Sequence, residues 1–385
     1  MKNSLEKPFE YLRRLGNGEP FGEETVRNWY IARAYVLDRL KDVAFGPTSS
    51  IHLHVVVTND SPLMLSVVRH VALAAHFINF DEDHEDESRR NRTVITLVSR
   101  NPKIKDELEK EEYLCHLPKH CKFVTKHSGT DKGEDAIVEN GNSYIDIEIH
   151  IVEEFAGDDN GNCLIIFSEE DVRAFQRETS PDAEETIFSI DTRKAVYANR
   201  IYTIGEMIDN LPAEDIHSAK RYSMALDIFL HDKLKRPMEP LVNKEKWKNI
   251  ITARERISNI FCADCFETRA QEIEKCATGD KNEDRFLWEK YNEQLSISEH
   301  ARWVVEKLIM GYSPLSPRQR FKDESLFYDK KRKAQYRKYL KKQSKAPAHI
   351  DLCSYADLRR LNPADMKYDT FMVLAIPLIL KKIKG

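Results

Sequence analysis

A short apolar run followed at once by a helix-start signal constrains the fold more than any other feature of this sequence. Residues 51–57 read IHLHVVV, a β-branched run of strand length, and the turn at 58–62 leads into an apolar helical pattern over 63–80. The Ser61 hydroxyl suits the N-cap because it can accept a free backbone N–H, and Pro62 suits the first helical position, where no donor is needed. The pattern predicts a strand, a turn and a helix.

Further strand-like runs follow at 93–98, 145–152, 164–167 and 186–190. A charged helix is expected to begin near Pro102. Another is expected after Ser168, because a serine followed three residues later by an acid, here Asp171, is typical of a helix N-cap. Strands that alternate with helices predict an α/β sheet. The join at 153–162 suits either a short crossover or a hairpin, so the strand order stays open. The acidic stretch at 81–91 is expected to be a solvated loop.

From about residue 205 the pattern is helical only, and prolines at 212, 237 and 240 mark a boundary region. We therefore predict an N-terminal helical arm (1–45), an α/β domain (46–205), a helical linker region (206–244) and a helical domain (245–385). The predicted fold class is α/β plus all-α.

Composition describes a water-soluble globular chain. Of its 385 residues 32% are charged and 41% hydrophobic, and the formal net charge of -4 gives no global attraction to nucleic acid or anionic membrane. The longest apolar run, at 371–380, is too short to span a bilayer, and the first residues do not resemble a signal peptide. Seven cysteines without regular spacing do not suggest a disulfide framework. We expect a cytoplasmic protein without a membrane span.

The helical third of the chain carries a motif set built around Glu-His-x-x-Trp ahead of a Gly-aromatic pair. Its members are Trp247, Arg254, Ser258, Asn259, Asp264, Glu299, His300, Trp303, Gly311, Tyr312, His349, Leu352, Tyr355, Leu358, Tyr368 and Asp369. Over roughly 245–384 this set resembles the bacterial form of the ryanodine-receptor (RyR) repeat domain. Two departures are Tyr312, where the family usually has Trp, and a lysine-rich stretch between Gly311 and His349.

The resemblance implies that the helical domain follows a degenerate Rossmann domain similar to the TrkA-N type. A Rossmann-like, mainly parallel sheet is then expected over 46–205, followed by an RyR-repeat-like helical domain. Such architectures imply an intracellular sensor of a nucleotide-derived signal, in bacterial stress or antiviral (anti-phage) signalling. We accordingly expect a small nucleotide-like ligand, a homo-oligomer and no cofactor.

The predicted ligand site lies on helices of this domain. Glu299 and Trp303 share a helical face and His300 flanks it, so an indole that can stack on a base lies beside polar groups. Arg254 presents a planar fork suited to phosphate. The alternatives are a core role for Trp303 and an ion pair for Arg254. The predicted contacts are Arg254, Ser258, Asn259, Glu299, His300, Trp303, Tyr312, His349 and Tyr355.

The α/β domain lacks the glycines that let a dinucleotide pyrophosphate approach the backbone, since none occurs between Gly46 and Gly129. Hydride transfer is therefore not expected. Asn59, Ser61 and Arg100 are predicted as a secondary anion site at a helix N-terminus, with an ordinary capped turn as the alternative.

Two other functions stay open. A nucleotide-processing enzyme would draw carboxylates from Asp60 and the acids at 169–171. A nucleic-acid-binding protein would use the lysine-rich stretch at 318–345, for which a solvated helical insert is preferred, so nucleic acid is not the expected partner. Cys262 and Cys265 have zinc-knuckle spacing without a second pair, so core thiols and no metal are expected. No catalytic residue is assigned.

Overall fold

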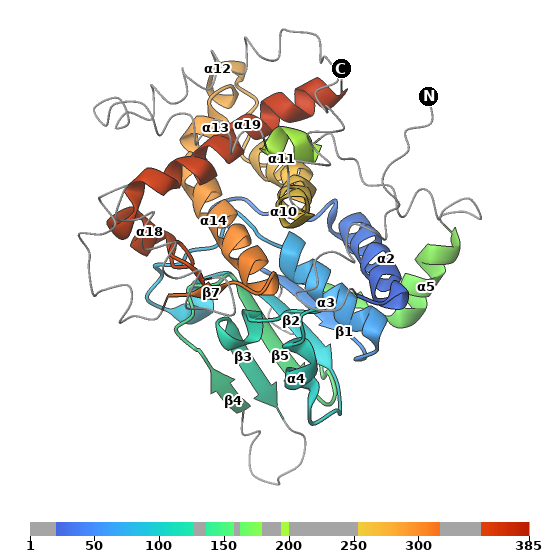
Figure 1. Cartoon of the computed structure of the whole chain (residues 1–385). Helices are drawn as coiled ribbons and strands as arrows, with labels where there is room; N and C mark the ends of the chain where they lie inside the picture. The colour runs from blue at the N-terminus through green and yellow to red at the C-terminus, as the bar shows by residue number, and fades with distance from the viewer. Residues whose placement is uncertain are drawn as a thin grey trace.

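A computed structural model gives the fold and describes residues 21–126, 136–157, 162–178, 194–199, 253–315 and 348–384. An α/β layer is followed in sequence by a helical part, and the two are packed together (Figure 1). The predicted coarse class, a mainly parallel sheet with many helices, is confirmed.

Six strands of the described residues form one sheet at the centre of the α/β layer. Its strands are β1 (Leu53–Val57), β2 (Thr93–Val98), β3 (Lys122–Lys126), β4 (Ala136–Glu139), β5 (Ile147–Val152) and β6 (Cys163–Phe167). The order is β4-β3-β5-β2-β1-β6, and every neighbouring pair is parallel except β3 with β4. Because β6 lies beyond β2 and β1 and runs parallel to β5, the join between β5 and β6 is a crossover and not a hairpin.

Both predicted helix starts in this layer are confirmed. Ser61 Oγ accepts the Met64 N–H at 3.4 Å where α3 (Pro62–Ala74) begins, and Ser168 Oγ accepts the Asp171 N–H at 3.1 Å where α5 (Glu169–Glu178) begins. Helix α3 ends before the predicted residue 80. The next backbone carbonyls, of Ala75 and His76, accept hydrogen bonds from other elements instead of from the helix.

One face of the sheet is buried under helices. Every second residue of the central strands is apolar and buried: Leu53, Val55, Val57, Ile95, Leu97, Ile147, Ile149 and Ile151. The helices of this layer are α2 (Glu23–Leu40), α3, α4 (Ile104–Leu108) and α5. Helix α2 packs along α3, and Tyr35 of α2 contacts Phe167 and Phe175 at ring distances of 5.3 and 5.4 Å. The described part of the expected N-terminal arm is thus one of the layer's helices.

The helical part packs on α3 through α10 and α14 (Figure 1). Its helices are α10 (Ala253–Asp264), α11 (Phe266–Glu274), α12 (Lys281–Asp284), α13 (Leu287–Lys290), α14 (Asn292–Ile309), α18 (Tyr355–Leu361) and α19 (Met366–Lys384). Two short parallel strands, β7 (Ser313–Pro314) and β8 (Ala348–His349), lie beside the end of α14. One hydrophobic core runs without interruption from the sheet into α10, α14 and α19.

Polar contacts also join the two parts. Arg33 of α2 forms an ion pair with Asp264 at the end of α10. The Glu82 carboxylate accepts the backbone N–H groups of Tyr355 and Ala356 at 2.9 and 2.7 Å, so it caps α18. For Glu82 the expectation of a solvated acidic loop is therefore wrong, because this side chain is sequestered at a helix N-terminus.

Strands β3 and β4 were not predicted, because KFVTK and AIVE are short and lack the alternation of apolar and polar residues that identifies a strand. The strand expected at 186–190 and the boundary region at 206–244 lie outside the described residues. Across the described ranges, no helix combines the length and the apolarity that crossing a bilayer requires.

Candidate functional site

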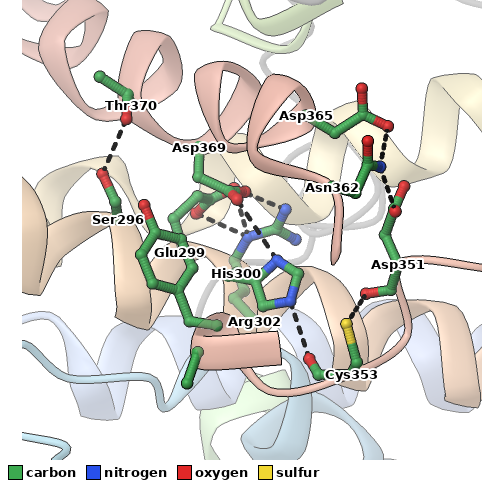
Figure 2. A network of polar contacts seen from close by, with 12 residues as sticks. Ser296, Glu299, His300, Arg302, Asp351, Cys353, Asn362, Asp365, Asp369 and Thr370 are labelled. Carbon is green, nitrogen blue, oxygen red and sulfur yellow. Dashed lines mark hydrogen bonds and ion pairs between the residues drawn. The ribbon is translucent and has the colours of Figure 1, made fainter. Parts of the chain in front are cut away.

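Helix α14 supplies the centre of the predicted site, and its interior side holds a buried ionic network. Arg302 donates to both carboxylate oxygens of Glu299 at 2.8–3.0 Å and to Glu306 Oε2 at 2.7 Å. Figure 2 shows Arg302 beside Glu299. The side chains of Glu299, Arg302 and Glu306 are almost fully buried, and the Cys262 thiol lies 3.6 Å from Glu299. Both oxygens of the Glu299 carboxylate thus accept hydrogen bonds from Arg302 inside the protein.

His300 is equally enclosed. Its Nε2 lies 2.9 Å from the Cys353 carbonyl and its Nδ1 lies 3.3 Å from Asp369 of α19 (Figure 2). Burial opposes protonation, but hydrogen bonds with the side chains of Asp369 and Cys353 outweigh it and raise the pKa of His300 well above its usual value. Tyr355 is 2% exposed and packs edge-on against the His300 ring. Both side chains are thus enclosed and support the site from inside.

The partly exposed end of α14 gathers the remaining predicted aromatic residues. The Trp303 ring stacks on that of His300, with the two planes 24° apart, and meets His349 of β8 nearly at right angles, with ring centroids 4.9 Å apart. His349 also faces Tyr312 at 6.4 Å. The predicted residues Trp303, Tyr312 and His349 are thus brought together, although 37 positions of sequence separate Tyr312 from His349.

Lys307, which sequence reasoning missed, completes this group. Its ammonium lies 5.7 Å from the Trp303 ring and 5.8 Å from the Tyr312 ring. It donates to Ser258 Oγ at 2.9 Å and to Glu306 Oε1 at 2.8 Å. A lysine one turn after Trp303 on the same helical face was the available signal. We call Trp303, Lys307, Tyr312 and His349 the aromatic–lysine site.

Helix α10 reaches the aromatic–lysine site through Ser258. Arg254 lies one turn earlier on the same helix and is partly exposed, as the predicted phosphate contact should be. Asn259 donates from Nδ2 to the Glu255 carbonyl at 2.6 Å, and its Oδ1 is buried with no hydrogen-bond partner in the described part of the chain. The two predicted groups, on α10 and on α14, are therefore neighbours.

This arrangement can bind a planar ring that carries an anionic group. The partly exposed Trp303 and Tyr312 rings offer aromatic surface, and the Lys307 ammonium offers a cation beside it.

No family model, curated protein or solved structure matches the chain. The geometry of the side chains therefore carries the functional argument.

The predicted secondary anion site at the N-terminus of α3 already holds a carboxylate. Ser61 Oγ donates to Glu169 Oε2 at 2.7 Å, and this hydrogen bond, chief among several, lowers the pKa of Glu169. Asn59 accepts the Ser61 N–H, while Arg100 is exposed and pairs with Glu154 at 2.6 Å. A bound phosphate would have to displace Glu169, so the capped-turn alternative describes this end of α3 better.

The carboxylates of the enzyme alternative have structural partners. Asp60 accepts from Ser99 Oγ at 2.5 Å and Asp171 accepts from Ser168 Oγ at 2.6 Å. Glu169 is held by Ser61, which leaves the exposed Glu170 as the remaining acid of the set. These contacts are those of caps and turns.

Cys262 and Cys265 are 1% and 2% exposed, as core thiols are, and burial raises the pKa of Cys265 to about 12. Within the described ranges, no three His, Cys, Asp or Glu side chains are grouped as a metal site would require. The lysine-rich stretch at 318–345 lies outside the described residues.

Proposed function

We propose that this protein is a sensor that binds a small nucleotide-derived ligand at the aromatic–lysine site and performs no chemistry on it. The observation that carries the proposal is the gathering of Trp303, Tyr312 and His349 around the Lys307 ammonium at one partly exposed end of α14. Stacking of one base on an aromatic side chain contributes about 1–3 kcal/mol, and a phosphate beside Lys307 adds a charge-assisted contact.

Buried groups hold the site in this geometry before any ligand arrives. Trp303 rests on His300, which is fixed by Asp369 and Cys353, and Lys307 is fixed by Ser258 and Glu306. A pre-ordered site loses less conformational entropy on binding, so a larger share of the contact energy appears as affinity. The resemblance to the RyR repeat domain, with a degenerate Rossmann domain before it, supports the same proposal, and bacterial stress or antiviral signalling is the role it suggests.

A chain segment that connects the site to the α/β layer supports the proposal that the protein is a sensor. His349 of the site begins the segment 349–356, which we call the strap. The strap contacts the α/β layer twice: Tyr144 donates from its hydroxyl to the Leu352 carbonyl at 3.1 Å, and Glu82 accepts the N–H groups of Tyr355 and Ala356. A ligand that favours one position of His349 therefore also favours one arrangement of the strap on the layer.

The proposal is tested by a thermal-shift screen with ATP, ADP-ribose and cyclic di- and oligonucleotides. A ligand present at 100 times its Kd stabilises the folded state by about 2.7 kcal/mol. Trp303→Ala and Lys307→Met should each abolish the shift, because one removes the stacking surface and the other the cation.

Phe286→Ala is the matched control, since Phe286 is 51% exposed, carries Arg285 over its ring at 4.4 Å and lies outside the site. It should leave the shift unchanged. Equal shifts in the wild type and in Trp303→Ala would refute the site. Consumption of a nucleotide in the same mixtures would favour the enzyme alternative.

A further inference from the structure

Strand β6 lies at one end of the sheet that the described residues form, and within that part of the chain its outer side has backbone groups without a partner. Cys163 N–H donates to the His52 carbonyl and the Phe167 carbonyl accepts the Thr58 N–H, so residues 163, 165 and 167 point their backbone groups toward β1. The backbone groups of Leu164 and Ile166 therefore point away from the sheet. Among the described residues neither of these two finds a partner on that side.

The side chains of β6 do not protect this edge from pairing with another strand. Exposed edges are usually protected by charge, by proline or by a bulge, because otherwise they pair with another strand. The strand reads Cys-Leu-Ile-Ile-Phe, and Leu164 and Ile166 are 39% and 48% exposed. The opposite edge, β4, also exposes Ile137 and Val138, but there Glu139 binds Lys105 with both carboxylate oxygens at 2.6 Å. The two edges thus differ in protection.

We propose that β6 pairs antiparallel with β6 of a second copy of this chain, about a two-fold axis at Ile165. In that register Leu164 of each copy faces Ile166 of the other. Both residues direct their N–H and C=O groups outward, so each pair exchanges two backbone hydrogen bonds and the two sheets become continuous. An axis at Leu164 would instead bring Ile166 opposite Asn162 of the partner subunit and bury an amide against an apolar side chain.

Charges on α5 fit the same second copy. Helix α5 follows β6 directly and lies at the margin of the helical layer, beside α2 (Figure 1). Its exposed acids, Glu170 and Asp171, lie in the first turn and its exposed Arg177 in the last. A two-fold axis makes the two α5 helices antiparallel, so the acidic turn of each meets Arg177 of the other. Stable interfaces bury about 1,200–2,000 Å² in total, so a dimer through one strand also needs contacts from the neighbouring α5.

The first test is the molar mass of the full chain, measured by size-exclusion chromatography with light scattering. The wild type should give twice the chain mass of 44.9 kDa at micromolar concentration. Ile166→Lys should give the single-chain mass, because it places two ammonium groups in the apolar centre of the interface. Ile137→Lys is the matched control on the other edge, where the isoleucine is 56% exposed, and should stay dimeric. Circular dichroism checks that both variants are folded.

Charge reversal and cross-linking test the orientation. Arg177→Glu should raise the dimer Kd at least tenfold, and adding Glu170→Arg should restore it. A chain with both Leu164→Cys and Ile166→Cys should form a dimer linked by disulfides under mild oxidation, whereas each single variant should not. A wild type of single-chain mass, or a dimer lost with Ile137→Lys and kept with Ile166→Lys, would overturn the proposal.

Discussion

Removing the Arg302 guanidinium tests whether the buried network of α14 is structural. Arg302 is fully buried and holds Glu299 and Glu306 by hydrogen bonds of 2.7–3.0 Å. In Arg302→Met, Glu306 keeps the Lys307 ammonium at 2.8 Å, whereas the hydrogen bond that Glu299 keeps among the described residues is the one from the Cys262 thiol at 3.6 Å. Breaking a buried pair by removing one partner costs about 3–5 kcal/mol, so we expect the free energy of unfolding to fall by that amount.

A second substitution separates this mechanism from simple loss of packing. The cost of Arg302→Met comes mainly from the uncompensated Glu299 carboxylate, so neutralising it in Arg302→Met/Glu299→Gln should recover about 1–3 kcal/mol. Urea unfolding followed by circular dichroism measures both variants, provided that the slopes of the transitions agree. A loss below about 1 kcal/mol in Arg302→Met, or no recovery in the double variant, would refute the reasoning.

Two further predictions concern the contacts between the two parts of the chain. Burial raises the pKa of Glu272, which accepts the Ile78 N–H at 2.7 Å, to about 7. The folded chain then binds the proton of the Glu272 carboxyl group more tightly than the unfolded chain does. The free energy of unfolding should therefore fall by up to about 3 kcal/mol as pH rises from about 4.5 to about 7. Urea titrations of Glu272→Gln should not show this dependence on pH. Glu82→Ala should lower the free energy of unfolding by about 1–2 kcal/mol and speed amide hydrogen exchange in α18, because it removes the carboxylate that caps this helix. Glu85→Ala, which changes a neighbouring exposed acid, should do neither. Equal exchange rates in the two variants would contradict the cap.

The sequence predicted those helix starts and strands that depend on residues close together in the chain. Ser61 and Pro62 marked the start of α3, and the β-branched runs marked β1, β2, β5 and β6. The edge strand β4 has no buried face, so its sequence lacks the alternation that identifies a strand. The position of β5 between β3 and β2 follows from pairings between distant segments, which periodicity does not encode.

Contacts between distant segments also decide which predicted residues of the candidate site are enclosed, and sequence periodicity does not encode those contacts. Helical spacing placed Glu299, His300 and Trp303 on neighbouring faces of α14, but it does not say which face meets the core. Packing against α19 encloses His300, and Arg302, which has the same spacing to Glu299 as an exposed surface pair, neutralises Glu299 inside. Lys307 was overlooked because a lysine in a helical pattern is usually solvated.

The most direct measurement of the central claim is a titration of the full chain with the nucleotide that gives the largest thermal shift, followed by isothermal calorimetry. We predict one site per chain for the wild type and for Phe286→Ala, and binding weaker by about 5- to 160-fold for Trp303→Ala, because loss of about 1–3 kcal/mol of stacking corresponds to factors of that size. Wild-type affinity in Trp303→Ala, or no binding of any nucleotide to the wild type, would contradict the account.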